Sequence, residues 1–435
     1  MAFLFLRFGY TLNVEFKKET LKNGVRLLTL PMSHLDSVAV IIGVSAGSRF
    51  EEPRTQGVAH FTEHMLFKGT KRRPNNRVIA TELESKGASF NAFTGPDITA
   101  YYVRSAAKNL PWSLEILTDL VFNSKFDPKE IEKEKGVIIE ELRMNHDNPQ
   151  DWVEHLSLGM VFPNHPLGRL ITGTEETIKG MKQSDFLSYL DGWYRSKNMV
   201  AIIAGNLSQK GALAKARELL AVLPKRSVGQ PLAFTRKQKN SAVLVEERPT
   251  DQTHYILGIR GYQRSHPKRE ALELLITVLG GGMSSRLFEE IREKRGLAYY
   301  VGAASYEFTD TGVVMVKAGV NSKKSAEAVK VTMGELARLK DQAVPEKELA
   351  KAKEMIRGHL LLGVESTGGA GMYALEQEVL EGKFETPEEK LKRIDAVAAK
   401  DLRQVAQDIF VAKNINLALI GPHKDSEIFR KLLSL

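Results

Sequence analysis

The feature of this chain that most restricts its fold is an internal repeat. Both halves present the same order of signals: strand-like runs, an apolar helical stretch, a glycine with alternating strands, two amphipathic helices and a closing buried strand. The closing strands match, since "NMVAIIAGNL" reaches Gly205 and "INLALIGPH" reaches Gly421. A period of about 217 residues is too long for a solenoid, so the repeat predicts two homologous domains.

The second pair of amphipathic helices matches in detail between the halves. "FDPKEIEKEKGVIIEEL" (126–142) and "AVPEKELAKAKEMIRGHLL" (343–361) both begin with a proline suited to the first helical turn. Alternating strands that face helices on one side predict an α+β fold of two homologous α/β layer-sandwich domains. We place these domains at 1–222 and 242–435. The segment 223–241 between them has prolines, glycine and basic residues without periodicity, which is typical of a linker.

Composition excludes several classes of protein. A chain of 435 residues with 43% hydrophobic and 26% charged residues is typical of a soluble multidomain protein. It contains no cysteine, so any metal must be held by His, Asp or Glu. The net charge is +9, but basic and acidic residues are interleaved, as in "EIEKEKGVIIEELR". That pattern favours solvated helix faces over a phosphate-binding stripe, so we expect no nucleic-acid partner.

The N-terminal stretch "MAFLFLRFGYTLNVEF" is a poor match to a secretory signal. Arg7 interrupts its short apolar run, and it lacks a basic n-region, a full h-region and a small-residue cleavage site. The sequence also has no uninterrupted apolar run of about 18 residues, so we expect no membrane span. These features together predict a cytoplasmic protein.

The stretch "AHFTEHMLFKGT" (59–70) carries the first candidate for chemistry. His60 and His64 are four residues apart, so on a helix they share a face and can reach one ion. Glu63 lies beside them, where a carboxylate can reach a water molecule on the open side of that ion. The pattern H-x-x-E-H is the inverse of the H-E-x-x-H motif of zinc peptidases. On these residues alone, a core helix with incidental histidines remains an alternative.

A third ligand has to come from elsewhere, and the predicted helix at 128–142 offers one. Ile131, Glu134, Ile138 and Glu141 fall at spacings that place them on one stripe of this helix. Two carboxylates on an apolar stripe are costly unless a cation compensates them. The alternative, a surface helix rich in glutamate, explains the other glutamates of the segment better than these two.

The repeat provides an internal control for the metal hypothesis. The second half lacks nearly all of the metal-compatible side chains at the corresponding positions. Val278, Gly281 and Gly282 stand opposite His60, Glu63 and His64, and Ala352 and His359 stand opposite Glu134 and Glu141. Incidental polar residues have no reason to gather in one half, so the control favours a metal site.

These residues resemble those of a known family. "LKNGVRLL", "GVAHFTEHMLFKGT" and "LGGGMSSRLFEEIREKRGLAYYV" resemble the pitrilysin and insulin-degrading-enzyme family of zinc peptidases, the inverzincins. Within that family they are most similar to the mitochondrial processing peptidase branch and its bacterial relatives. The resemblance runs from about residue 14 to the C-terminus. It implies two domains that close on the substrate as a clamshell.

The resemblance assigns roles to the residues of the metal constellation. It makes His60, His64 and Glu141 the ligands of one Zn²⁺ per chain. Glu63 becomes the general base that acts on zinc-bound water, and Glu134 becomes a supporting carboxylate that orients the site without being a primary ligand.

The resemblance also implies residues that contact the substrate. Arg292 and Tyr299 in "REKRGLAY" match an Arg/Tyr pair that the family brings across to the substrate, although the residues alone indicate an ordinary helix end. Asn91, Ala92 and Phe93 in "SFNAFT" match an edge strand to which an extended peptide adds as a further strand.

The predicted function is therefore that of a zinc metalloendopeptidase acting on peptides or on unfolded, presequence-like segments. The alternative is a catalytically silent scaffold or partner subunit of the same fold in a heterodimeric peptidase, which the complete set of site residues disfavours. The family often builds its chamber from two such chains, so we expect a homodimer or a heterodimer with a related chain.

Overall fold

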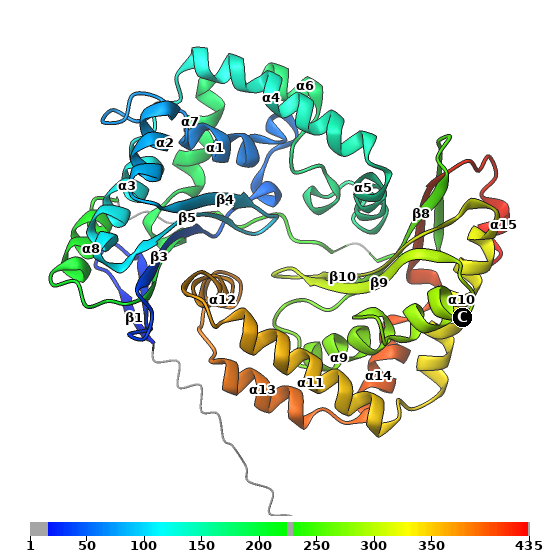
Figure 1. The fold of residues 1–435 in the computed structure, drawn as a ribbon. Helices are drawn as coiled ribbons and strands as arrows, with labels where there is room; N and C mark the ends of the chain where they lie inside the picture. Colours follow the sequence, from blue (N-terminus) through cyan, green and yellow to red (C-terminus); the bar gives the residue numbers. More distant parts are fainter. Residues whose placement is uncertain (1–15, 224–228, 236, 434–435) are drawn as a thin grey trace, which may run out of the picture.

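The computed structural model describes residues 16–223, 229–235 and 237–433. The stretch 1–15, on which most of the signal-peptide argument depends, lies outside the described residues, as does part of the predicted linker at 223–241. Figure 1 shows two halves, each with a sheet and helices. The prediction of an α+β fold with two homologous layered domains in a clamshell is confirmed.

The first half contains a six-stranded sheet in the order β1-β2-β6-β3-β5-β4. Its strands are β1 (Lys17–Thr20), β2 (Arg26–Pro31), β3 (Ser37–Val44), β4 (Ser89–Thr94), β5 (Thr99–Ala106) and β6 (Met199–Gly205). Its helices are α1 (Val58–Leu66), α2 (Asn76–Ser85), α3 (Leu110–Asn123), α4 (Pro128–Asp147), α5 (Pro149–Val161), α6 (Glu175–Gly180), α7 (Gln183–Trp193) and α8 (Ala212–Ala221).

The second half contains a five-stranded sheet in the order β7-β11-β8-β10-β9. Its strands are β7 (Ala242–Glu247), β8 (Gln252–Gly261), β9 (Ala298–Glu307), β10 (Gly312–Asn321) and β11 (Ile415–Gly421). Its α-helices are α9 (Arg269–Gly280), α10 (Ser325–Asp341), α11 (Glu346–Gly363), α12 (Thr367–Leu380), α13 (Pro387–Ala396), α14 (Ala399–Ile409) and α15 (Glu427–Arg430). A π-helical segment, η6, covers Phe288–Glu293.

The strands β2 to β6 have the same topology as β7 to β11, and β1 is an additional strand at one edge of the first sheet. In the first half the closing strand β6 pairs in parallel with β2. In the second half the closing strand β11 pairs in parallel with β7. The remaining pairs are antiparallel, and the sheets end on β4 and β9. The apolar run of each closing strand is buried along its whole length, because both faces of the sheet are covered.

Each sheet is covered on one face by helices of its own half and on the other by a helix of the opposite half. Helix α12 packs on β3 and β6, and α5 packs on β8 and β11. A glycine allows the close approach in both places: a Cβ at Gly43 would lie 2.2 Å from Leu375, and one at Gly258 would lie 2.5 Å from Ser157. The sequence predicted helices on one face only, because nothing local indicates that a helix crosses to the other half.

A buried arginine links the halves. Arg49 is 2% exposed, and its guanidinium bonds the carbonyl of Leu232 between the halves at 2.8 Å. The same group contacts Asp97 in the first half and Thr309 and Asp310 in the β9–β10 turn of the second half. One side chain thus fixes three separate segments.

The predicted correspondence between α4 and α11, on which part of the metal hypothesis depends, agrees with the burial of both helices. Ile131, Glu134 and Ile138 on α4 are buried, and so are the corresponding Leu349, Ala352 and Ile356 on α11. The alignment that sets Val278, Gly281 and Gly282 opposite His60, Glu63 and His64 also pairs Met65 with Met283, and this pairing does not hold. Met65 is buried, whereas Met283 is 80% exposed because α9 has already ended at Gly280.

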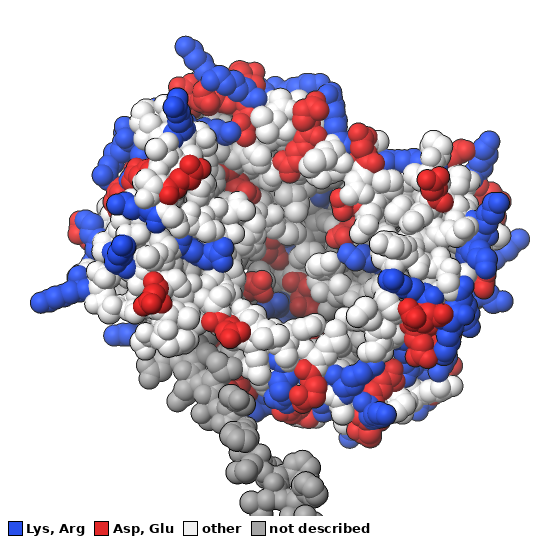
Figure 2. Space-filling view, in the orientation of Figure 1, with Lys and Arg blue, Asp and Glu red and all other residues white. Residues whose placement is uncertain are grey.

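The surface is hollowed between the two halves, as Figure 2 shows, and Asp and Glu side chains are visible inside the hollow. Among the described helices, none combines the length and the apolar character that crossing a membrane requires.

Candidate metal centre

Helix α1 begins at a tightly constrained turn. Gly57 precedes it with φ +93, and a Cβ there would lie 2.6 Å from the carbonyl oxygen of Thr172, so only glycine fits. The buried carboxylate of Glu51 accepts hydrogen bonds from the backbone N–H groups of Gly57 and Ala59, both at 2.8 Å. These bonds satisfy donors that the first turn of a helix leaves free. They also fix the start of the segment that carries the histidines.

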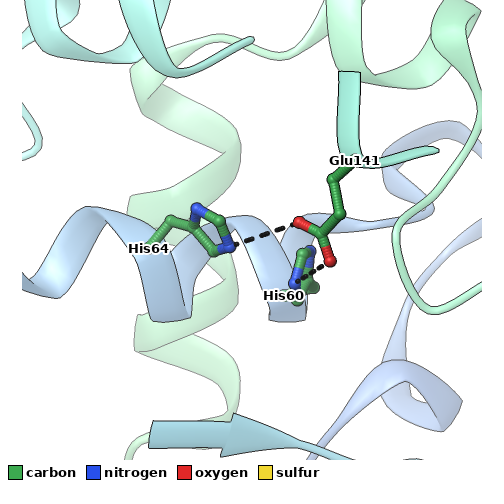
Figure 3. Close-up of side chains that lie close together, drawn as sticks. All are labelled: His60, His64 and Glu141. Carbon is green, nitrogen blue, oxygen red and sulfur yellow. Dashed lines mark ion pairs between the residues drawn. The ribbon is translucent and has the colours of Figure 1, made fainter. Parts of the chain in front are cut away.

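Figure 3 shows that His60 and His64 on α1 face Glu141 on α4. Their ligand atoms all lie within 4.8 Å of one another. Nε2 of His60 lies 3.6 Å from one carboxylate oxygen of Glu141, and Nε2 of His64 lies 3.7 Å from the other. Such separations suit donors that would each approach a shared zinc ion to about 2 Å. Among the described residues, these three form the group that could hold a metal.

The protonation state of His60 suits a metal ligand. Burial, with a smaller effect of nearby His64, lowers the pKa of His60 to about 4, so this ring is neutral at pH 7. Only neutral imidazole can bind a metal. Burial raises the pKa of Glu141, and its partial exposure leaves the carboxylate open toward the histidines. Neighbouring Glu140 instead is exposed and pairs with Arg143.

Glu134 lies directly behind His64. It is 4% exposed, and its Oε1 lies 2.8 Å from Nδ1 of His64 while its Oε2 lies 2.5 Å from Nζ of Lys68. Burial acts to raise the pKa of Glu134, but the hydrogen bonds from His64 and Lys68 outweigh it and lower the pKa. The carboxylate therefore accepts the proton of Nδ1 and leaves Nε2 of His64 free on the Glu141 side. Lys68 was not among the predicted site residues.

Glu63 projects from the same helix toward the edge strand. Its Oε2 accepts a hydrogen bond from the hydroxyl of Thr94, the last residue of β4, at 2.5 Å. Burial raises the pKa of Glu63, and the hydrogen bond from Thr94 lowers it in part. A raised pKa brings a carboxylate closer to the range of a useful general base. Thr94 was missed by the sequence analysis, although it ends the same "SFNAFT" segment that was predicted to bind substrate.

The predicted substrate strand is at the edge of its sheet. Asn91, Ala92 and Phe93 lie on β4, which pairs with β5 and ends the strand order. The side chains of Asn91 and Phe93 are exposed, and Asn91 Oδ1 accepts the backbone N–H of Ala92 at 2.9 Å. Helix α1 packs against β4, so this edge adjoins the metal group.

Arg292 and Tyr299 lie in the second half, on η6 and at the start of β9. The guanidinium of Arg292 stacks over the rings of Phe288 and Tyr299, at 4.8 and 5.7 Å from their centroids. The side chain of Tyr299 is 75% exposed. Within the described part of the chain, the structure brings these two residues together but places neither in contact with His60, His64 or Glu141. Their catalytic role stays a prediction.

Two family models match the chain in succession. Residues 29–175 match the model described as insulinase, peptidase family M16, and residues 181–356 match the model described as the peptidase M16 inactive domain. The first match contains the whole metal group. The second contains Arg292 and Tyr299 and the larger part of the second half, up to residue 356.

Curated relatives match over nearly their whole length. A protein of Bacillus subtilis named uncharacterized zinc protease YmxG is 33% identical over 93% of this chain and 98% of its own. An uncharacterized zinc protease of Rickettsia bellii is 36% identical over 94% of this chain and 98% of its own.

Two solved structures share the fold. A protease from Helicobacter pylori superposes with a TM-score of 0.89 at 23% identity, covering 93% of this chain and 99% of that one. A structure titled peptidase M16 inactive domain from Pseudomonas fluorescens gives 0.87 at 20% identity, covering 94% of this chain and 98% of that one.

Proposed function

The chain belongs to peptidase family M16, and on that premise we propose that it is a zinc metalloendopeptidase with one catalytic site, in its first half. The observation that carries the proposal is the convergence of His60, His64 and Glu141 from two helices, with Glu63 beside them. Three protein donors and one open position are typical of a catalytic zinc site rather than a structural one.

The residues present fit a zinc ion. The donor set is two imidazoles and one carboxylate, which zinc accepts, and a cysteine ligand is excluded by composition. A zinc ion held there would supply Lewis-acid polarisation of a peptide carbonyl and would lower the pKa of water. Glu134 would hold His64 in the tautomer that presents Nε2.

Glu63 performs the proton transfers in this proposal. Its free carboxylate oxygen takes a proton from the attacking water, and the same oxygen then gives that proton to the leaving amine nitrogen. The C–N bond breaks and one water is consumed: its hydroxyl joins the carbonyl carbon, and the proton carried by Glu63 joins the amine. Tyr299 and Arg292 would reach the substrate from the second half and stabilise the negative charge that develops on the carbonyl oxygen.

The proposed substrate is an extended peptide or an unfolded, presequence-like segment. The edge of β4 supports this, since β4 has a neighbouring strand on one side only and an added strand can pair on the other, where the N–H of Ala92 would exchange the side chain of Asn91 for the peptide. Asn91, Ala92 and Phe93 would contact the peptide in this arrangement. A segment that is buried inside a folded protein cannot pair in this way. We further propose that the chain works as a homodimer or as a heterodimer with a related chain.

A test of the function uses the purified chain, loaded with zinc, on a peptide library. We expect cleavage that a chelator abolishes and that Glu63→Gln lowers by about 100- to 10,000-fold. Cleavage that survives both treatments would refute the proposal. Inactivity of the intact chain alone, followed by activity with a related chain added, would identify it as one subunit of a heterodimer.

A further inference from the structure

The hydroxyl of Thr94 connects the edge strand to the proposed base. Thr94 Oγ1 lies 2.5 Å from Glu63 Oε2. Among the described residues, Thr94 is the one that donates a hydrogen bond to the Glu63 carboxylate. An ionised carboxylate can only accept, so the hydroxyl donates. One oxygen of Glu63 is thus occupied, and the other is left for water.

The backbone on both sides of Thr94 is held in place. Within the sheet Thr94 pairs with Thr99, which is fully buried and donates its hydroxyl to the carbonyl of Ala46 at 2.9 Å. The next residue, Gly95, closes a tight turn by donating to the carbonyl of Ile98 at 2.8 Å. The hydroxyl of Thr94 therefore projects from a fixed point.

A second contact locks that turn against the rest of the domain. The N–H of Ser48 donates to the carbonyl of Gly95 at 3.1 Å. The backbone there is so close that a Cβ on Gly47 would lie 1.9 Å from the same oxygen. Because the turn cannot shift without breaking this contact, the position of Thr94 relative to α1 is set by the main chain.

From this geometry we propose that Thr94 is a positioning residue for Glu63, an inference that rests on the proposed function. Its hydroxyl holds one oxygen of the carboxylate at β4 and leaves the other oxygen free for water. A peptide paired to β4 is anchored by the strand that also anchors the base. The register between the scissile carbonyl and Glu63 is then fixed by a single element.

The test compares Thr94→Val, which keeps the shape but removes the hydroxyl, with Thr94→Ser, which keeps the hydroxyl. Loss of a hydrogen bond to a charged group predicts a kcat about 10- to 100-fold lower for Thr94→Val. We expect KM and zinc content to be unchanged, because the hydroxyl acts on the chemical step. Thr94→Ser should stay within about threefold of the wild type in kcat.

Thr62 offers a matched control. It is a fully buried threonine on α1, next to Glu63 in the chain, and its hydroxyl has no hydrogen-bond partner among the described residues. Thr62→Val should leave kcat unchanged. If Thr94→Val also keeps its kcat, or if it loses zinc in proportion to activity, the positioning role is refuted.

A second readout does not depend on catalysis. The free energies of unfolding of the metal-free wild type, Thr94→Val, Glu63→Ala and the double variant form a double-mutant cycle. We expect the two changes to be non-additive, because they remove the same contact. Additive effects would overturn the proposal about Thr94 whether or not the chain is a peptidase. If the effects are non-additive but the chain cleaves no peptide, the contact between Thr94 and Glu63 is supported and the proposed function is refuted.

Discussion

Glu134 and His64 form a 2.8 Å hydrogen bond between Oε1 and Nδ1, and the second oxygen of the same carboxylate holds Lys68. This pair joins α4 to α1 behind the metal group. It sets which nitrogen of His64 carries the proton, and so which one faces Glu141.

Glu134→Gln should lower the affinity for zinc by about 10- to 100-fold, since a carboxylate that orients a ligating histidine contributes that much. Competition with a fluorescent chelator measures the effect. Glu132→Gln is the matched control on the same helix, because Glu132 is exposed and pairs with Lys135. Equal affinities in the two variants would contradict the role of Glu134.

Glu141→Gln should abolish stoichiometric zinc binding, whereas Glu140→Gln should retain it. The two residues are adjacent in sequence, but Glu141 faces both histidines and Glu140 pairs with Arg143 at the surface. Elemental analysis of the purified variants measures the bound zinc. Retention of zinc by Glu141→Gln would place the third ligand elsewhere.

Glu51 should make stability depend on pH. Burial raises its pKa to about 8, against opposing hydrogen bonds from Gly57 and Ala59 and the charge of Arg169. The folded state therefore holds a proton that the unfolded chain releases above its usual pKa of 4.5. Glu51 therefore contributes fully to the stability of the folded state below about pH 4.5. This contribution declines as the pH rises and is lost above about pH 8.

Urea unfolding of the metal-free chain between pH 5 and 8 checks this, in buffers chosen to span the window. We expect the wild type to lose stability relative to Glu51→Gln as the pH rises, by a few kcal/mol in order of magnitude. Glu52→Gln is the control, since Glu52 is exposed. A pH-independent difference between wild type and Glu51→Gln would show that Glu51 is already ionised in the folded protein.

Arg49→Ala should destabilise the chain by about 3–5 kcal/mol, because it leaves the buried Asp97 without its cation. It also removes the bonds to Leu232 and Asp310 that hold the second half. Scanning calorimetry measures the change. Arg54→Ala is the comparison: Arg54 pairs with Asp185 from an exposed position, so its loss should cost less than about 1 kcal/mol.

Tyr299→Phe and Arg292→Ala should each lower kcat by about 100-fold without changing zinc content, if they stabilise charge on the substrate. Neither residue contacts the metal group in the described structure, so the zinc content of each variant should equal that of the wild type and serves as the control for correct folding of the site. Tyr306→Phe, on the same strand and also exposed, should leave kcat unchanged. Full activity of Tyr299→Phe would remove it from the site.

The features that follow from the periodicity of a single helix or strand could be predicted from the sequence alone. The four-residue spacing of His60 and His64 places both on one face of a helix, and the stripe through Glu134 and Glu141 separates them from exposed Glu140. The repeat predicted two similar domains, because each half carries its own alternation of strands and helices. Arg292 and Tyr299 came from resemblance, since their local pattern is that of an ordinary helix end.

Which distant segments meet depends on the packing of the whole chain. The contact of Thr94 with Glu63, the cap that Glu51 forms on α1 and the bonds of Arg49 across the halves join residues that no periodicity relates. The packing of α5 on the second sheet and of α12 on the first sheet also joins segments that lie far apart in the sequence. Such contacts are selected by the burial of apolar surface and by the need to pair each buried polar group, which are properties of the whole packed chain.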